Sequence, residues 1–291
     1  MSLIEKAVKH LERMNQQHDT AETGEPRVSR AASSQTFLTT VTPQPAASRP
    51  VQIDLERLAA SGMIVPDTPG SLIAEEFRVL KRPLLANAAR NTNRPIRNAN
   101  LIMVTSALPQ EGKSFVAANL AMSIAMELER TALLIDADVA RPSLPGLLGL
   151  HPQAGLLDVL QDRTRHIGEV MLRTNVANLN LVMAGTPHPR ATEMLASETM
   201  ARLLDEIANR YPDRIIIFDS PPLLLTTQAR ALARHMGQIV FVVHAEQTLQ
   251  SAVKEALATI DGCPMKYAVL NQARSTNPLV YGYEYHYGSG R

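Results

Sequence analysis

The sequence predicts an α/β fold built on a doubly wound, mainly parallel sheet, and the alternation of two patterns carries this prediction. From residue 101 onward, short apolar runs of strand length are separated by segments with helical periodicity. The runs are apolar at nearly every position, which is typical of strands that helices cover on both faces. Repeated strand–helix units of this kind form parallel sheets. The expected strands are 101–104, 131–135, 179–183, 214–218, 238–243 and 267–270.

Helices are expected before and between these strands. The stretch 71–89 is expected to form a helix that is interrupted or restarted at Pro83, because proline cannot donate the helical hydrogen bond. Residues 115–129 are rich in Ala, Leu and Met, which are strong helix formers. Further helical patterns cover 193–210 and 249–260.

The chain divides into four segments by composition. An apolar stripe predicts an amphipathic helix over residues 1–18. Residues 19–70, poor in large apolar side chains up to residue 50, are expected to be a flexible linker. The α/β domain is expected over 71–275, followed by a tyrosine-rich tail over 276–291.

Composition limits the classes of protein to which this chain could belong. A formal net charge of +1 gives no argument for nucleic-acid binding. No apolar run reaches transmembrane length and no signal peptide is apparent, so we expect a chain without a membrane span. The single cysteine, Cys263, excludes an internal disulfide and suits a reducing cytoplasm.

The stretch 101–114, LIMVTSALPQEGKS, places Gly-Lys-Ser between the first expected strand and a helix. This is the layout of a phosphate-binding P-loop, in which backbone N–H groups and the helix dipole face the phosphates. Lys113 is expected to neutralise the β- and γ-phosphates, and the Ser114 hydroxyl to ligate Mg²⁺. A chance Gly-Lys-Ser is the alternative, and the flanking strand and helix argue against it. The expected nucleotide-binding residues here are Ala107, which replaces the usual glycine, Gln110, Glu111, Gly112, Lys113, Ser114 and Phe115.

Two later strands lead into aspartates. Asp136 and Asp138 follow one strand, and Asp219 follows another. Ligands of doubly wound folds bind at the carboxyl ends of the strands, so these side chains are expected beside the P-loop. Mg²⁺ prefers oxygen ligands, and phosphoryl transfer needs a group that orients or deprotonates the nucleophile, so three aspartates suffice for both tasks. For each aspartate alone, a helix cap or a solvated loop charge is the alternative.

The motif Asp136-Ala-Asp138-Val-Ala-Arg141-Pro142, together with Asp219-Ser-Pro-Pro, resembles the bacterial tyrosine kinases of exopolysaccharide synthesis, whose fold is related to the MinD/ParA ATPases. The resemblance covers roughly residues 71–291 and includes GLLDVL at 155–160, AGTPHPRATEMLAS at 184–197 and the Asn-Gln pair at 271–272. Two short stretches, SLIEKA at 2–7 and EEFRVLKRPLLANA at 75–88, are most similar to the tyrosine autokinases of exosortase-type polysaccharide loci.

The resemblance implies roles for individual residues. Lys113, Asp136 and Asp138 would be catalytic, with one of the two aspartates assisting Mg²⁺ and the other acting on the tyrosine hydroxyl. Ser114, Asp136 and Asp219 would form the metal site, Asp219 through water, and Asn271 would lie near the adenine. The chain departs from the family at three positions, none of which is a phosphate or metal ligand: Gln110 for Gly, Ala140 for Arg and Gln228 for Asp.

The tail carries four of the six tyrosines: Tyr281, Tyr283, Tyr285 and Tyr287. This alternation could form a terminal edge strand. The flanking glycines and the absence of a following strand pattern favour a cluster of phosphoacceptors instead.

A further resemblance concerns self-association, which the family achieves through an ExxRxxR-type helix before the P-loop. Here Glu75, Arg78 and Lys81 occupy these positions, with Pro83 where asparagine is usual. Lysine lacks the bidentate fork of arginine, so the pairing could differ. A solvated charged helix face is the alternative.

The predicted function is therefore an ATP- and Mg²⁺-dependent protein-tyrosine autokinase that phosphorylates its own tail in trans and regulates exopolysaccharide synthesis or export. The alternative is a MinD/ParA-like ATPase switch that binds partners without tyrosine phosphorylation. Leu108 stands where that class has a second lysine, and such a switch does not explain the tail. A nucleotide-binding scaffold without transfer is a third possibility, against which the intact P-loop and aspartates argue.

The resemblance also implies partners and a location. We expect a homo-oligomer and a separate inner-membrane activator of the chain-length-determinant type, with no nucleic-acid partner. The chain would then be cytoplasmic and recruited to the inner face of the cytoplasmic membrane.

Overall fold

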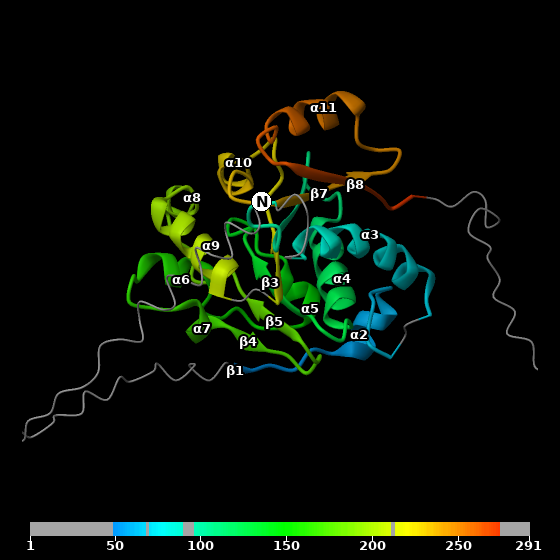
Figure 1. Ribbon diagram of the computed structural model, residues 1–291, viewed down its shortest axis with the longest axis horizontal. Coiled ribbons are helices and arrows are strands. Elements are labelled where there is room, and N and C mark those ends of the chain that lie inside the picture. The colour runs from blue at the N-terminus through cyan, green and yellow to red at the C-terminus, as the bar shows by residue number, and fades with distance from the viewer. Residues whose placement is uncertain (1–48, 68–69, 90–95, 211–212, 274–291) are drawn as a thin grey trace, which may run out of the picture. The chain divides into compact units, whose positions relative to one another are not determined.

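A single sheet of eight strands forms the centre of the computed structural model, which describes residues 49–67, 70–89, 96–210 and 213–273 (Figure 1). The strands follow the order β1-β4-β5-β3-β6-β2-β7-β8, and every neighbouring pair is parallel except β4–β5. Their bounds are β1 Arg49–Pro50, β2 Leu101–Ser106, β3 Thr131–Asp136, β4 Leu172–Arg173, β5 Leu179–Val182, β6 Arg214–Asp219, β7 Gln238–His244 and β8 Met265–Asn271.

Helices cover both faces of this sheet. Along β2, Leu101 and Met103 belong to one buried apolar cluster, whereas Ile102 and Val104 belong to a second one on the opposite face. The doubly wound, mainly parallel architecture expected from the apolar runs is therefore confirmed. The helices are α2 Leu55–Ala60, α3 Leu72–Ala88, α4 Lys113–Ala125, α5 Leu144–Leu148, α6 Leu156–Gln161, α7 Ile167–Val170, α8 Ala191–Leu195, α9 Glu198–Arg210, α10 Thr227–Ala233 and α11 Gln250–Ala258.

Helix α3 runs through Pro83 without a break, so the expected interruption is wrong. The missing N–H leaves the carbonyl of Val79 without its helical donor. Val79 is 72% exposed, so water can reach this part of the helix. On the opposite side, Phe77 and Leu84 are buried, and this packing keeps the helix continuous.

The single helix expected over 193–210 is divided into α8 and α9. Ser197 lies at the break, and its Oγ accepts a hydrogen bond from Met200 N at 3.2 Å, as an N-cap residue does. The Ser-Glu pair at 197–198 therefore marks the start of a new helix within the apolar pattern.

Residues 49–67, which the sequence predicts to be linker, fold onto the domain as a strap that we call the N-terminal strap. Its backbone at Ile53 exchanges two hydrogen bonds with the Asn175 side chain, at 2.8 and 3.1 Å. Ile64 N donates to Asn119 Oδ1 of helix α4 at 2.7 Å. Five apolar side chains of the strap are buried: Ile53, Leu58, Met63, Ile64 and Val65. The described part of the 19–70 segment is thus structural, because these side chains complete the core beside α4.

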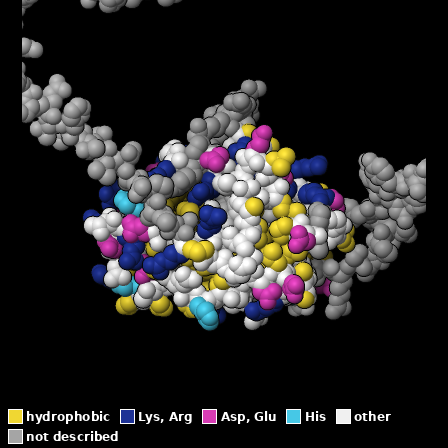
Figure 2. Space-filling view, turned by 90° about the horizontal axis from the view of Figure 1, so that it is seen from below, with side chains coloured by type: hydrophobic (Ala, Val, Ile, Leu, Met, Phe, Trp, Pro, Cys, Tyr) yellow, Lys and Arg dark blue, Asp and Glu magenta, His cyan; other side chains and the backbone are white. Residues whose placement is uncertain are grey.

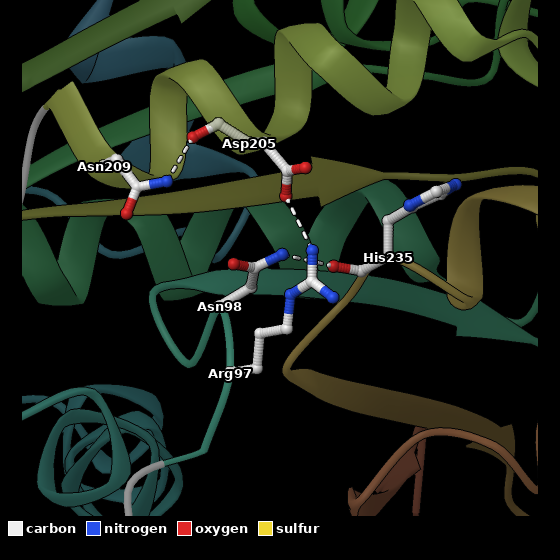
Figure 3. A network of polar contacts seen from close by, with 5 residues as sticks. All are labelled: Arg97, Asn98, Asp205, Asn209 and His235. Atoms are coloured by element: carbon white, nitrogen blue, oxygen red, sulfur yellow. Dashed lines mark hydrogen bonds and ion pairs between the residues drawn. The ribbon is translucent and has the colours of Figure 1, made fainter.

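A polar network holds the segment that leads into β2 (Figure 3). Arg97 pairs with Asp205 of α9 at 3.3 Å, and Asn98 Nδ2 donates to the His235 carbonyl at 3.2 Å. Asn209 Nδ2 donates to the Asp205 carbonyl at 2.7 Å. These contacts attach the start of the central strand to α9 and to the end of α10, at the edge opposite the P-loop.

Two sequence predictions lie outside the described residues: the amphipathic helix over 1–18 and the tail over 276–291. Within the described residues, no helix is both long enough and apolar enough to span a membrane.

Candidate nucleotide site

The loop between β2 and α4 has the backbone shape of a P-loop. Gly112 lies at the N-cap of α4 with φ +90°, and Gln110 also has a left-handed φ of +64°. A Cβ at Gly112 would overlap the Asn271 side chain, so glycine is required there for both reasons. Ala107 is fully buried and has a negative φ, so its replacement of glycine brings no backbone strain.

The Glu111 side chain stabilises this loop through hydrogen bonds, a role that the sequence did not predict. The carboxylate is 2% exposed and accepts the Leu108 N–H at 2.6 Å. It also accepts the Thr248 hydroxyl, which comes from the segment after β7. Asn271, the last residue of β8, donates from Nδ2 to the Glu111 carbonyl at 2.9 Å. Contacts from the ends of β7 and β8 therefore fix the loop in place.

Asn271 thus lies against the P-loop backbone, where it acts on the loop itself. The predicted contact with adenine stays a prediction. The loop was recognisable from Gly-Lys-Ser, whereas its supports come from residues far along the chain.

Asp136 and Asp219 lie side by side next to the P-loop. They end the adjacent strands β3 and β6 and are register partners in the parallel ladder. Both are fully buried. One oxygen of each, Oδ1, has no hydrogen-bond partner among the described residues. The two buried carboxylates therefore each retain an oxygen that could accept a further ligand.

Burial and mutual repulsion perturb these carboxylates. Burial, aided by the Asp219 charge, raises the pKa of Asp136 to about 8. Burial raises the pKa of Asp219 to about 7, against the lowering effect of the Ser114 hydroxyl and the Lys113 charge. Burial likewise raises the pKa of Asp138, which lies within the influence of the Lys113 ammonium. A cation between Asp136 and Asp219 would return both to the charged form.

Ser143 is a second residue that the sequence did not predict. Its hydroxyl donates to Ser114 Oγ and lies 3.5 Å from Asp219 Oδ2. The next residue, Leu144, donates its backbone N–H to Asp136 Oδ2 at 3.4 Å. The start of α5 therefore connects the P-loop serine to both carboxylates. The only sequence signal was a serine in front of a short helix with proline near its start.

A cavity of about 960 Å³ opens beside Ser114 and Ser143. On one side lie P-loop residues, including Lys113, which is 8% exposed, and on the other lies Asp138 with Arg141. The exposed Leu225 contributes an apolar rim. The remaining lining residues are Pro109, Gln110, Gly112, Ser114, Phe115, Ala140, Ser143, Gly146, Leu147, Pro221, Pro222 and Thr226.

The predicted self-association residues do not form one exposed row on α3. Glu75 and Arg78 pair with each other on the surface of the helix. Lys81 is 6% exposed; its Nζ donates to the Ser123 carbonyl at 2.5 Å and pairs with Glu127 at 2.6 Å. The expectation for Lys81 is therefore corrected: its charge is used to join α3 to the end of α4. The four predicted phosphoacceptor tyrosines lie outside the described residues.

The fold and the loop between β2 and α4 define a doubly wound α/β protein with a P-loop. Among solved structures, the chain is similar to the chimerical protein CapA2B2, with a TM-score of 0.61 and 25% sequence identity. That match covers 76% of this chain and 92% of the CapA2B2 chain.

Sequence relatives define the family more narrowly. The putative tyrosine-protein kinase CapB of Staphylococcus aureus is 31% identical over 227 residues, covering 77% of this chain and 95% of CapB. The chain therefore belongs to the bacterial tyrosine-protein kinase family. The succinoglycan biosynthesis transport protein ExoP of Rhizobium meliloti is 33% identical over 196 residues, which cover 67% of this chain but 24% of ExoP. No protein-family model matches the sequence.

Proposed function

We propose that this chain is an ATP-dependent protein-tyrosine kinase that phosphorylates Tyr281, Tyr283, Tyr285 and Tyr287 in a neighbouring copy of itself. The observation that carries the proposal is that the P-loop and Asp138 line one cavity, while the buried Asp136 and Asp219 end adjacent strands and Asp219 contacts Ser143, which also lines the cavity. Membership of the bacterial tyrosine-protein kinases supports this reaction type. The tyrosine-rich sequence at 281–287 supports the choice of acceptor.

The residues at the site fit a magnesium ion. The unpartnered Oδ1 atoms of Asp136 and Asp219 supply hard oxygen ligands, and the Ser114 hydroxyl lies beside them through Ser143. When bound, Mg²⁺ would neutralise charge on the phosphate oxygens. Among the residues that the structure describes, no cluster of three or more His, Cys, Asp or Glu side chains could hold a metal. This suits an ion that takes its remaining ligands from nucleotide phosphates and water.

Different groups of the protein would then have different roles in phosphoryl transfer. Backbone N–H groups of the P-loop and the Lys113 ammonium hold the β- and γ-phosphates. The tyrosine oxygen attacks the γ-phosphorus as the bond to the ADP oxygen breaks, and the phenolic proton passes to Asp138. Asp138 lines the cavity, and its raised pKa makes it a better proton acceptor than an ordinary aspartate.

Mass spectrometry of the purified full chain after incubation with Mg-ATP tests the proposal. We expect phosphotyrosine in 276–291, and Lys113→Met should abolish it while thermal unfolding stays close to wild type. Lys254→Met, on the exposed side of α11, is the matched control and should remain active. Absence of tail phosphotyrosine, also in the presence of a candidate membrane activator, would overturn the kinase assignment.

Transfer between copies is tested by mixing two variants. The Lys113→Met chain supplies an intact tail without activity, and a chain with all four tail tyrosines changed to phenylalanine supplies activity without acceptors. Phosphate on the Lys113→Met chain is the expected result. Phosphorylation of wild type alone, with none in the mixture, would show transfer within one chain.

We propose in addition that the chain acts at the inner face of the cytoplasmic membrane with an activator of the chain-length-determinant type and regulates exopolysaccharide synthesis or export. The similarity to part of ExoP supports this setting. Co-expression with candidate export proteins should move the chain into the membrane fraction. A chain that stays entirely in the soluble fraction with every candidate would contradict the recruitment.

A further inference from the structure

Ser143 precedes helix α5 but does not cap it. A serine at the N-cap of a helix normally accepts a hydrogen bond from a backbone N–H of the first turn. The Ser143 side chain makes no such bond, and Pro145 in the first turn has no N–H to donate. Ser71, at the N-cap of α3, shows the ordinary arrangement, because its Oγ accepts the Ala74 N–H at 3.3 Å. The Ser143 hydroxyl is therefore available for other contacts.

The Ser143 hydroxyl points to the P-loop instead. It donates to Ser114 Oγ and lies 3.5 Å from Asp219 Oδ2. A hydrogen bond between the Ser114 hydroxyl and Asp219 also lowers the pKa of that carboxyl, against the larger effect of burial. The three side chains thus form one hydrogen-bonded group, and two of them, Ser114 and Asp219, belong to the predicted metal site.

The number of protons sets the direction of these hydrogen bonds. Each hydroxyl carries one proton and two acceptor lone pairs. Since Ser143 donates to Ser114, the Ser114 proton is the one that reaches Asp219. The Ser143 proton then occupies one lone pair of Ser114 Oγ, and the other lone pair can bind a cation. The two hydrogen bonds prevent rotation of the Ser114 hydroxyl, so the direction of this second lone pair is fixed.

Backbone contacts hold Ser143 in place. Its carbonyl accepts the Leu147 N–H at 3.0 Å in the first turn of α5, and the next residue, Leu144, donates its N–H to Asp136 Oδ2 at 3.4 Å. Leu144 is buried in the apolar cluster that also contains side chains of α4. The position of Ser143 is therefore determined by the same packing that holds the helix after the P-loop.

The surroundings of this group differ from the charged surface of the protein. On the face shown in Figure 2, Lys and Arg side chains are interspersed with Asp and Glu side chains. Exposed charges are screened by water and salt, and their pairs contribute little energy. Asp136 and Asp219 are fully buried instead, and the Oδ1 atom of each has no partner among the described residues. Attraction of a cation by these carboxylates is stronger in such a low-dielectric environment.

We propose that Ser143 is a positioning residue of the magnesium site, whose hydroxyl holds the Ser114 hydroxyl in the orientation that binds the ion. The inference rests on the Mg²⁺-nucleotide site of the proposed function and adds a residue to it. Ser143 acts through Ser114 and Asp219, and it does not itself contact the ion. Removal of a hydrogen-bond partner of a metal ligand typically weakens metal binding by roughly 10- to 100-fold.

Magnesium affinity, measured without phosphoryl transfer, tests the proposal. The full chain is mixed with a fluorescent ADP analogue and titrated with Mg²⁺, and the fluorescence change gives the apparent Kd of the ion. Ser143→Ala should raise this Kd roughly 10- to 100-fold. Affinity for the analogue in EDTA should stay at the wild-type value, because the P-loop N–H groups and Lys113 are unchanged. An unchanged Mg²⁺ Kd would overturn the proposal. A lower Kd would do so too, since Ser143 would then compete with the ion for Ser114.

Two further variants separate the hydroxyl from other effects of the change. Ser143→Thr keeps a hydroxyl on the same carbon and should retain the wild-type Mg²⁺ Kd. Ser71→Ala removes the N-cap serine of α3, so it should lower Tm and leave the Mg²⁺ Kd unchanged. An equal loss of Mg²⁺ affinity in Ser143→Thr and Ser143→Ala would contradict a role for the hydroxyl.

A thiol at each serine distinguishes positioning from direct binding. Thiolate ligands favour soft metal ions, so Ser114→Cys, at a predicted ligand, should shift the preference from Mg²⁺ toward Cd²⁺ relative to wild type. Ser143→Cys should show no such shift. Cd²⁺-selective binding by Ser143→Cys would place residue 143 among the ligands and exclude the positioning role.

These readouts separate the inference from the proposed function. If wild type binds Mg²⁺ with the nucleotide and Ser143→Ala binds it equally well, the inference fails and the kinase assignment stands. If Ser143→Ala loses Mg²⁺ affinity but wild type never phosphorylates tyrosine, the positioning role holds and the kinase assignment is wrong.

Discussion

Gln110 occupies a left-handed backbone position in the P-loop, where the family resemblance leads one to expect glycine. A non-glycine residue in this conformation is strained by about 1–2 kcal/mol. Glycine would remove the strain, but its greater flexibility in the unfolded chain would offset roughly half of that gain. The departure seen in the sequence is therefore a cost in stability that leaves the phosphate-binding groups in place.

We predict that Gln110→Gly raises the free energy of unfolding by up to about 1 kcal/mol, because glycine relieves the strain. Chemical denaturation measures the change. Gln110→Ala keeps the left-handed backbone under the same strain and removes the side chain, so it should not stabilise. Equal stabilisation by both variants would assign the effect to the side chain and contradict the backbone explanation.

The buried aspartates make stability depend on pH. The pKa of Asp136 is raised to about 8 and that of Asp219 to about 7, so the folded protein holds protons that the unfolded chain releases. Between pH of about 4 and about 8 the folded state binds more protons, and its stability therefore falls as pH rises.

We predict that Tm of the nucleotide-free protein falls from pH 5 to pH 8 and that Asp136→Asn flattens this dependence. Each 1 kcal/mol corresponds to about 2–4 °C for a domain of this size. Asp67→Asn, at an exposed aspartate, is the control and should retain the wild-type slope. Added Mg-ADP should raise Tm most at pH 8, where the carboxylates must be charged. A wild-type Tm that rises over this range would contradict the assignment.

At the scale of elements, the N-terminal strap changes how the site is supported. It contacts α4 through Asn119 and α5 through Arg57, whose Nη2 donates to the Gly146 carbonyl at 3.2 Å. Helix α4 begins at the P-loop, and α5 begins at Ser143 beside the carboxylates. The N-terminal strap, which the sequence predicts to be part of a linker, thus supports α4 and α5, two elements that line the nucleotide cavity.

Ile64→Ala should destabilise the protein by about 2–5 kcal/mol, since Ile64 is 1% exposed and truncation leaves a cavity against α4. Gln52→Ala, at an exposed strap position, should stay within about 0.5 kcal/mol of wild type. Denaturant melts compare the two. A near-neutral Ile64→Ala would restore the interpretation of this segment as a linker.

At the scale of the whole molecule, the two sides of α3 differ in their surroundings. Lys81 turns inward to the end of α4, whereas Leu72 and Val79 are 65% and 72% exposed and lie two helical turns apart. Exposed apolar side chains beside the Glu75–Arg78 pair are suited to contact with another copy. Self-association through this face remains a prediction.

Val79→Glu should weaken self-association without lowering Tm, because it adds a charge to an exposed contact. Lys81→Ala should lower the free energy of unfolding by about 1–3 kcal/mol, because it leaves the Ser123 carbonyl without its donor. Sedimentation velocity and thermal unfolding separate the two effects. The reverse pattern would place Lys81 at the interface and Val79 in the domain.

The sequence by itself determined the α/β class, the P-loop and the aspartates that follow two strands. These features depend on local signals: apolar runs, a Gly-Lys-Ser at a helix start and side chains next to strand ends. The family resemblance rested on the same short motifs. The sequence predicted an interruption of α3 at Pro83, and this prediction was wrong. The local rule for proline could not take into account the packing of Phe77 and Leu84, which keeps the helix continuous.

Tertiary structure alone decided which residues meet. Asp136 lies opposite Asp219 through strand register, Thr248 reaches Glu111 across 137 positions, and Asn175 holds Ile53 across 122 positions. Such contacts come from burial and hydrogen-bond satisfaction between distant segments, and a local pattern carries no information about them.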